Sequence, residues 1–297
     1  MDIIRTSSLG HAYGDTVALR GLDLSIPGGI NGLVGANGAG KTTLMKILLG
    51  ILDPTAGNAE VLGDRVDLEK ATVRSKVGYM PEGDCLPRQQ SAADFISYAA
   101  ELAGIPATAA RQRASDVLTL VGLGEERFRY LGDYSTGMKQ RAKLAQAIVH
   151  HPDLVFLDEP TAGLDPAGRD EMLDLIRRIG GFGINVLTSS HVLTDIEQTC
   201  DFVVMLDAGT VLRQGSITGI VTQTTVDVEV QGASDTLAQA LRNAGATVLV
   251  DGRRLEVAFD QGDPFDLIRD QLIATGTGLR RMSARSSSLE DVYLGGA

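Results

Sequence analysis

One segment constrains this chain more than any other: Gly35-Ala36-Asn37-Gly38-Ala39-Gly40-Lys41-Thr42, which matches G-x-x-x-x-G-K-[ST] at every fixed position. It follows an apolar run at residues 30–34 and opens a segment of helical periodicity. Glycines let successive backbone N–H groups face a chain of phosphates, and the helix N-terminus adds partial positive charge. The lysine of such a loop reaches the β and γ phosphates, and Thr42 presents a hydroxyl to Mg²⁺. The segment predicts a nucleotide-binding site.

A second motif stands 118 positions downstream of residue 40, where an apolar run at residues 154–157 ends in two adjacent carboxylates, Asp158 and Glu159. Successive residues at the end of a strand point in different directions, so the two carboxylates can have different roles. A magnesium nucleotide site needs one carboxylate for the metal and, for hydrolysis, a second group that deprotonates the attacking water. Asp158 suits the first role and Glu159 suits the second.

The pattern of the first 216 residues favours an α/β fold. Short β-rich runs alternate with helix-length segments, and several of the runs are continuously apolar, which is typical of strands buried on both faces of a largely parallel sheet. A helix-rich stretch at about residues 90–150 interrupts the alternation and predicts an inserted helical subdomain, with helices at residues 92–103, 108–121 and 136–150. The expected strands are residues 22–26, 30–34, 77–80, 154–157, 184–188 and 202–206.

The rest of the chain predicts a second, smaller α+β domain. Residues 217–225 are poor in charge and are expected to be a linker. Residues 226–297 then show a β-α-β-β-α order, with strands at 226–231, 247–250 and 255–259 and helices at 237–244 and 264–274. A further strand near residues 279–284 would complete a small split-βαβ sheet.

Composition excludes several classes of protein. The longest unbroken apolar run, residues 202–206, is far shorter than the roughly 18 to 20 residues that cross a bilayer. The first residues lack the features of a secretory signal, and two cysteines do not make a disulfide framework, so we expect a reducing, cytosolic compartment. The net charge of −11 argues against broad binding to nucleic acid.

Together, these motifs resemble those of the ATP-binding subunits of ABC transporters, in the expected order over about the first 215 residues. Tyr13 resembles the aromatic residue that stacks on adenine. Residues 134–141 resemble the signature sequence, residues 161–165 the loop after the catalytic glutamate, and His191 the switch histidine. The resemblance implies a mixed β-sheet cassette, with ATP and Mg²⁺ as ligands. The nucleotide-binding residues would be Tyr13, residues 35–43 including Gly35, Lys41, Thr42 and Thr43, and Glu82, Ser135, Gly137, Asp158 and Asp165.

The resemblance also implies a mechanism. Two cassettes meet head to tail, as a homodimer or a paired cassette, so that Ser135 and Gly137 of one chain cover the ATP bound by the other. Glu159 acts as the base, His191 contacts the γ phosphate and positions the water, and Lys41 neutralises charge. Asp165 lies where the family passes information between the two sites. The implied metal contacts are Thr42, Asp158 and Glu82.

Two positions depart from the family's usual pattern. Glu82 stands where glutamine is common, which keeps an oxygen for the metal but adds a charge. Thr136 stands where the signature usually has glycine. This variant, together with the C-terminal domain that closes at residues 289–294, resembles the branch of the family that serves exporters of drugs, antibiotics and other hydrophobic substrates.

Three hypotheses follow for the function. The leading one is an ATPase that drives a separate membrane permease from the cytosolic face of the membrane, docking through residues 82–91 and the helices of residues 90–121. The alternative is a soluble ABC-type ATPase that acts on a ribosome or nucleic-acid complex; such proteins usually carry two cassettes or a long coiled coil, and this sequence shows neither. In the third, the C-terminal domain binds a ligand rather than stabilising the structure or a dimer.

Overall fold

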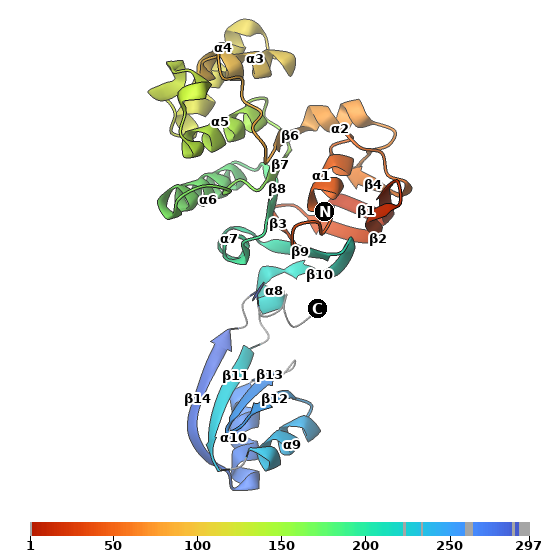
Figure 1. Ribbon diagram of the computed structural model, residues 1–297, viewed down its shortest axis with the longest axis vertical. Coiled ribbons are helices and arrows are strands. Elements are labelled where there is room, and N and C mark those ends of the chain that lie inside the picture. The colour runs from red at the N-terminus through yellow and green to blue at the C-terminus, as the bar shows by residue number, and fades with distance from the viewer. Residues whose placement is uncertain (1, 222–223, 233, 259–263, 287–288, 291–297) are drawn as a thin grey trace. The chain divides into compact units, whose positions relative to one another are not determined.

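The structure is a computed structural model that describes residues 2–221, 224–232, 234–258, 264–286 and 289–290 (Figure 1). The chain divides into two compact units, Met1–Gly215 and Ser216–Ala297. No helix among the described residues is long and apolar enough to cross a membrane.

The larger unit contains a six-stranded sheet in the order β10-β9-β3-β8-β7-β6. The pairs β9–β3, β3–β8, β8–β7 and β7–β6 are all parallel. The prediction of an α/β fold with a largely parallel core sheet is therefore confirmed. The strands are β3 (Ile30–Val34), β6 (Val77–Met80), β7 (Leu154–Asp158), β8 (Asn185–Ser190), β9 (Phe202–Asp207) and β10 (Thr210–Ser216).

Strand β7 shows why its sequence is continuously apolar. Leu154 and Phe156 join a core with helix α1 (Lys41–Leu48), whereas Val155 and Leu157 join a core with helices α5 (Thr136–Ile148) and α6 (Pro166–Gly181). Because both faces of the strand are covered, every side chain of β7 is buried. The C-terminal end of this strand is therefore held firmly from both sides.

A second sheet, in the order β2-β1-β4-β5, is antiparallel and was not expected from the sequence. Residues 22–26, correctly expected to be a strand, lie in β2 of this sheet. Leu22, Leu24 and Ile26 are buried while Asp23 and Ser25 are exposed, an alternation that is typical of an antiparallel sheet with one solvated face. Its strands are β1 (Asp2–Tyr13), β2 (Thr16–Pro27), β4 (Ala56–Val61) and β5 (Asp64–Arg65).

Residues 90–150, all of them described, form helices and short 3₁₀ turns with no strand. Helix α3 (Ala92–Leu102) packs against α4 (Ala107–Leu120) and α5, with apolar side chains of all three in one core (Figure 1). The predicted helices agree with these bounds to within two residues. Two shorter helices complete the larger unit, α2 (Lys70–Lys76) and α7 (Leu193–Thr199).

The smaller unit is a four-stranded antiparallel sheet in the order β12-β13-β11-β14, with a core shared with α9 and α10. The segment expected to be a linker is partly helical: the Ser216 hydroxyl accepts a hydrogen bond from the Gly219 N–H at 3.1 Å, which starts a turn at α8. Residues 222–223, 259 and 291–294 lie outside the described residues. The elements are α8 (Ile217–Val221), β11 (Thr224–Gln231), α9 (Asp235–Asn243), β12 (Thr247–Asp251), β13 (Arg254–Ala258), α10 (Pro264–Thr275) and β14 (Gly278–Ser286).

Candidate functional site

The C-terminal ends of four parallel strands, β3, β6, β7 and β8, meet at a cavity of about 240 Å³. Ligands of α/β sheets bind at this edge, outside the carboxyl ends of the strands. Most of the residues predicted for the nucleotide line the cavity. The lining residues are Ala18, Ala36, Asn37, Gly38, Gly40, Lys41, Thr42, Thr43, Glu82, Asp158, Glu159 and His191.

The loop between β3 and α1 depends on two glycines. A Cβ atom at Gly35 would lie 2.5 Å from the carbonyl oxygen of Leu206, and Gly40 has a φ of 104°, which other residues rarely adopt. Lys41 begins α1, and its Nζ donates hydrogen bonds to the carbonyl oxygens of Gly35 at 2.6 Å and Ala36 at 3.3 Å. The loop is thereby wrapped around a buried lysine at the N-terminus of a helix, which is a cradle for phosphate.

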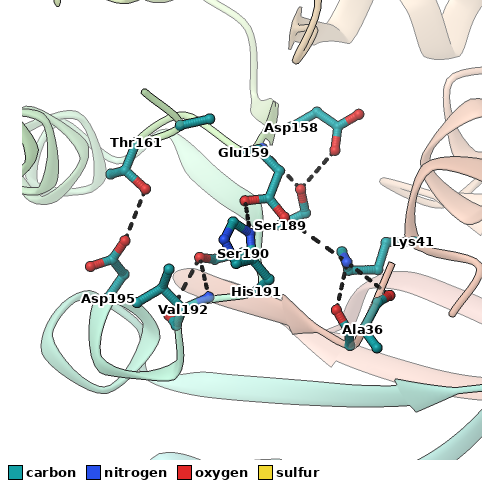
Figure 2. Close-up of polar contacts among 12 residues, drawn as sticks. Ala36, Lys41, Asp158, Glu159, Thr161, Ser189, Ser190, His191, Val192 and Asp195 are labelled. Atoms are coloured by element: carbon teal, nitrogen blue, oxygen red, sulfur yellow. Dashed lines mark hydrogen bonds and ion pairs between the residues drawn. The ribbon is translucent and has the colours of Figure 1, made fainter. Parts of the chain in front are cut away.

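The two carboxylates at the end of β7 are both buried and diverge, as predicted (Figure 2). Glu159 has a φ of 50°, an uncommon backbone conformation that turns the chain at this point. Ser189, opposite Asp158 in the parallel register of β8, donates from Oγ to Asp158 Oδ1 at 2.7 Å and accepts from the Glu159 N–H at 3.0 Å. One hydroxyl thus holds the carboxylate of Asp158 and the backbone of Glu159.

The Glu159 side chain has two polar neighbours. Its Oε2 lies 2.9 Å from Nδ1 of His191, and its Oε1 lies 3.9 Å from Nζ of Lys41 (Figure 2). Because a carboxylate only accepts hydrogen bonds, Nδ1 of His191 carries the proton of this bond. The carboxylate is held in place while most of the imidazole remains exposed. This arrangement suits a general base positioned by a histidine.

Three oxygen-bearing side chains border the cavity together: Thr42 at the start of α1, Asp158 after β7 and Glu82 after β6. Hydroxyl and carboxylate oxygens are the ligands that Mg²⁺ prefers, usually with the phosphates of a substrate and several waters. The donor set brought together here therefore fits the metal expected from the sequence.

Other predicted residues do not line this cavity. Tyr13, at the end of β1, is 48% exposed, and its ring packs edge-on against His11 with the ring centroids 4.6 Å apart. Ser135 is the N-cap of α5 and accepts from the Met138 N–H at 3.3 Å, and Asp165 is the N-cap of α6. Gly35, Ala39 and Gly137 are also not among the lining residues.

Sequence reasoning missed three buried polar residues near the site, Asp195, Lys143 and Ser189. Asp195 of α7 accepts hydrogen bonds from the Thr161 hydroxyl at 2.9 Å and from Nε of Arg169 at 2.5 Å. It thus ties the loop after β7 to the helix that follows His191. Lys143 of α5 binds the loop after β6. Neither residue belongs to a local motif, whereas Ser189 could have been found as the residue that pairs with Asp158 once β7 and β8 are set in parallel.

The comparisons with known proteins agree on one family. The family model described as ABC transporter matches residues 19–162. The uncharacterised ABC transporter ATP-binding protein YxlF of Bacillus subtilis (strain 168) is 35% identical over 266 residues, 88% of this chain and 88% of that protein. The daunorubicin/doxorubicin resistance ATP-binding protein DrrA of Streptomyces peucetius is 32% identical over 302 residues, 98% of this chain and 91% of that protein.

Solved structures share the fold. The structure of cbiO1 from Clostridium perfringens, part of the ABC transporter complex cbiONQ, has a TM-score of 0.68 at 28% identity and covers 74% of this chain and 90% of that chain. The chain therefore belongs to the ATP-binding proteins of ABC transporters, which hydrolyse ATP to drive transport.

Proposed function

We propose that this protein powers an exporter of drug-like, antibiotic or other hydrophobic substrates, through a membrane permease that is a separate chain. The observation that carries the proposal is the extent of the similarity to DrrA. At 98% of this chain, the similarity includes both the cassette and the C-terminal unit. That relative is named for resistance to daunorubicin and doxorubicin. The variant signature at residues 134–138 supports the same branch of the family.

In the proposed reaction, Glu159 takes the proton of the attacking water, and His191 holds Glu159 and contacts the γ phosphate. The 2.9 Å contact between the two side chains supports the holding of Glu159 by His191. Lys41 would exchange its backbone acceptors for phosphate oxygens. Thr42, Asp158 and Glu82 would hold Mg²⁺, which neutralises charge on the phosphates as the bond to the leaving group breaks.

The second part of the proposal is a head-to-tail dimer. Ser135 and Gly137 stand at the N-terminus of α5 and do not line this chain's own cavity, so they suit the ATP of a second copy. The Ser135 oxygen accepts a backbone hydrogen bond, but its hydroxyl hydrogen still can donate to a phosphate. Tyr13 would stack on adenine, and Asp165 would lie between the two sites.

The permease would hold the cassette on the cytosolic face of the membrane, docking through residues 82–91 and the helices of residues 90–121. Exposed apolar side chains on α3 support this surface: Tyr98 is 54% exposed and Leu102 is 70% exposed. The C-terminal unit would be an accessory domain of the cassette.

Co-expression with a candidate permease encoded beside this gene tests the proposal. We expect the two proteins to purify together in detergent and, in vesicles, to export a fluorescent hydrophobic compound when ATP is supplied. A complex that carries Glu159→Gln is the matched control and should bind the permease without exporting. Purification with ribosomes and not with the membrane protein would contradict the proposal.

A further inference from the structure

Lys143, on helix α5, is buried with only 4% of its surface exposed, although lysine side chains are rarely buried. Its Nζ donates to three consecutive carbonyl oxygens: Pro81 at 2.7 Å, Glu82 at 2.9 Å and Gly83 at 3.2 Å. An ammonium group has three N–H donors, and each has an acceptor here. Burial lowers the pKa of Lys143, while the carboxylates of Asp84, Glu82 and Asp158 act in the opposite direction. Lys143 is therefore a buried side chain with a hydrogen-bond acceptor for each N–H, and not a solvated surface charge.

The carbonyls belong to the segment that leaves the sheet after β6, residues 81–85, which we name the 81–85 loop. Met80 before it is fully buried and Leu86 after it is 7% exposed, both in the core shared with the helical subdomain. The loop between these anchors is otherwise largely exposed, and it carries Glu82 to the border of the nucleotide cavity. Lys143 thus holds the middle of the loop from the helical side.

Helix α5 has a second attachment near the nucleotide. Its N-cap is Ser135, and Lys143 lies about 12 Å further along the helix axis. Gln140, on the same helix, donates from Nε2 to the carbonyl oxygen of Ala162 at 3.1 Å, in the loop after β7. A movement of α5 therefore acts on backbone segments that adjoin both Glu82 and Glu159.

We propose that Lys143 is a positioning residue: it couples α5, whose N-terminus would cover the ATP of a second copy, to the loop that places Glu82 at this chain's own nucleotide. The effect on Glu82 rests on the proposed function of that residue, whereas the holding of the loop does not. Without the three hydrogen bonds, the 81–85 loop opens locally, and the carboxylate of Glu82 is no longer held at the nucleotide cavity.

Cys85 provides a probe within the loop itself. Its side chain is exposed, whereas Cys200 is buried and burial raises the pKa of its thiol far above the ordinary range. In the full-length protein, we expect Lys143→Met to raise the rate at which N-ethylmaleimide modifies Cys85 on the order of tenfold. Mass spectrometry measures this rate. Partial burial raises the pKa of the Cys85 thiol, and the Lys143 charge acts in the opposite direction. Opening of the loop relieves the burial and speeds the reaction, whereas loss of the charge alone would slow it. Acceleration therefore reports opening of the loop.

The variants and controls separate the possible causes. Lys76→Met, which removes a partly exposed charge just before β6, should leave the rate unchanged. Lys143→Arg, which keeps the charge and the donors, should return the rate toward that of the native protein. If Lys143→Met does not fold, Lys143→Gln replaces it, because its shorter amide loses at least one donor and should act in the same direction. A rate in the folded Met or Gln variant equal to or below the native rate would overturn the proposal.

Hydrolysis provides the second measurement. Lys143→Met should raise the Mg²⁺ concentration for half-maximal ATPase activity about fivefold, while ATP affinity measured in EDTA changes less than about twofold, since Lys41 and its loop are untouched. Unchanged Mg²⁺ dependence despite faster labelling would overturn the coupling to Glu82. Absence of ATPase activity in the native protein would contradict the proposed function instead, and the labelling rates would still decide whether Lys143 holds the loop.

Discussion

The Oε2 atom of Glu159 lies 2.9 Å from Nδ1 of His191, and the other carboxylate oxygen of Glu159, Oε1, lies 3.9 Å from Nζ of Lys41 (Figure 2). The three residues come from different strand ends, since Glu159 follows β7, His191 follows β8 and Lys41 follows the loop after β3. The carboxylate is therefore oriented by the packing of the whole sheet. A small displacement of any one strand end would alter the geometry of the proposed base.

Glu159→Gln should abolish hydrolysis while leaving ATP binding intact. The amide has nearly the same shape but cannot take a proton from water, so we expect ATPase activity to fall at least about 100-fold. ATP bound without turnover should then trap a dimer, detected by size-exclusion chromatography with light scattering with and without MgATP. Glu125→Gln, at an exposed position of the helical subdomain, is the control. A Glu159→Gln protein that is monomeric in both conditions would contradict the head-to-tail model.

Lys41→Ala should weaken nucleotide binding itself. Its ammonium is buried beside the loop that would hold the phosphates, so its loss removes charge-assisted hydrogen bonds to them. We expect the dissociation constant for ATP to rise at least about tenfold, equivalent to about 1.4 kcal/mol, measured with a fluorescent ATP analogue. Lys46→Ala removes an exposed lysine of the same helix and should bind like the native protein. Equal affinity of the two variants would count against the assigned loop.

The sequence predicts those parts of the site whose residues lie next to each other in the chain. The phosphate loop carries its glycines and lysine within eight positions, and the two carboxylates are adjacent. The geometry of the loop therefore follows from the end of one strand, and the geometry of the carboxylate pair follows from the end of another. The parallel core was also predictable, because burial on both faces leaves continuous apolar runs.

Contacts between distant segments were not predictable in this way. Lys143 and the carbonyl of Glu82 are 61 positions apart, and Asp195 and Thr161 are 34 apart. Nothing local marks a lysine that will be buried, because the acceptors are backbone carbonyls that every residue has. The antiparallel sheet was missed for a different reason, since register shifts interrupt the pairing of β1 with β2 and with β4.

Gly78→Ala should destabilise the larger unit without touching the nucleotide. A Cβ atom on Gly78 in β6 would lie 1.9 Å from the carbonyl oxygen of Ala147 in α5, so the helix and strand would have to separate. We expect the free energy of unfolding to fall by about 3 kcal/mol, measured by urea denaturation. Gly181→Ala, where a Cβ meets nothing within 4 Å, should change stability by less than about 1 kcal/mol. Equal stability of the two variants would show that α5 does not approach β6 this closely.

His150 should make folding sensitive to mild acid. Its Nε2 lies 3.1 Å from the carbonyl oxygen of Val77, to which it donates, and burial lowers the pKa of His150 below its ordinary value of 6.5, helped by the nearby Arg113 cation. Between the lowered pKa and 6.5, the unfolded chain binds more protons than the folded chain. The free energy of unfolding therefore falls as pH falls through this window, by less than the limit of about 1.4 kcal/mol per pH unit for one proton.

His150→Gln isolates this effect, because the amide can donate to the Val77 carbonyl but does not titrate. We expect urea denaturation to show a larger loss of stability between pH 8 and pH 5.5 in the native protein than in the variant. Groups common to both proteins cancel in this difference, so His150 accounts for what remains. Equal losses of stability in the two proteins would mean that His150 titrates alike in the folded and unfolded chains. The His150 ring at the end of α5 would then be solvated in the folded protein.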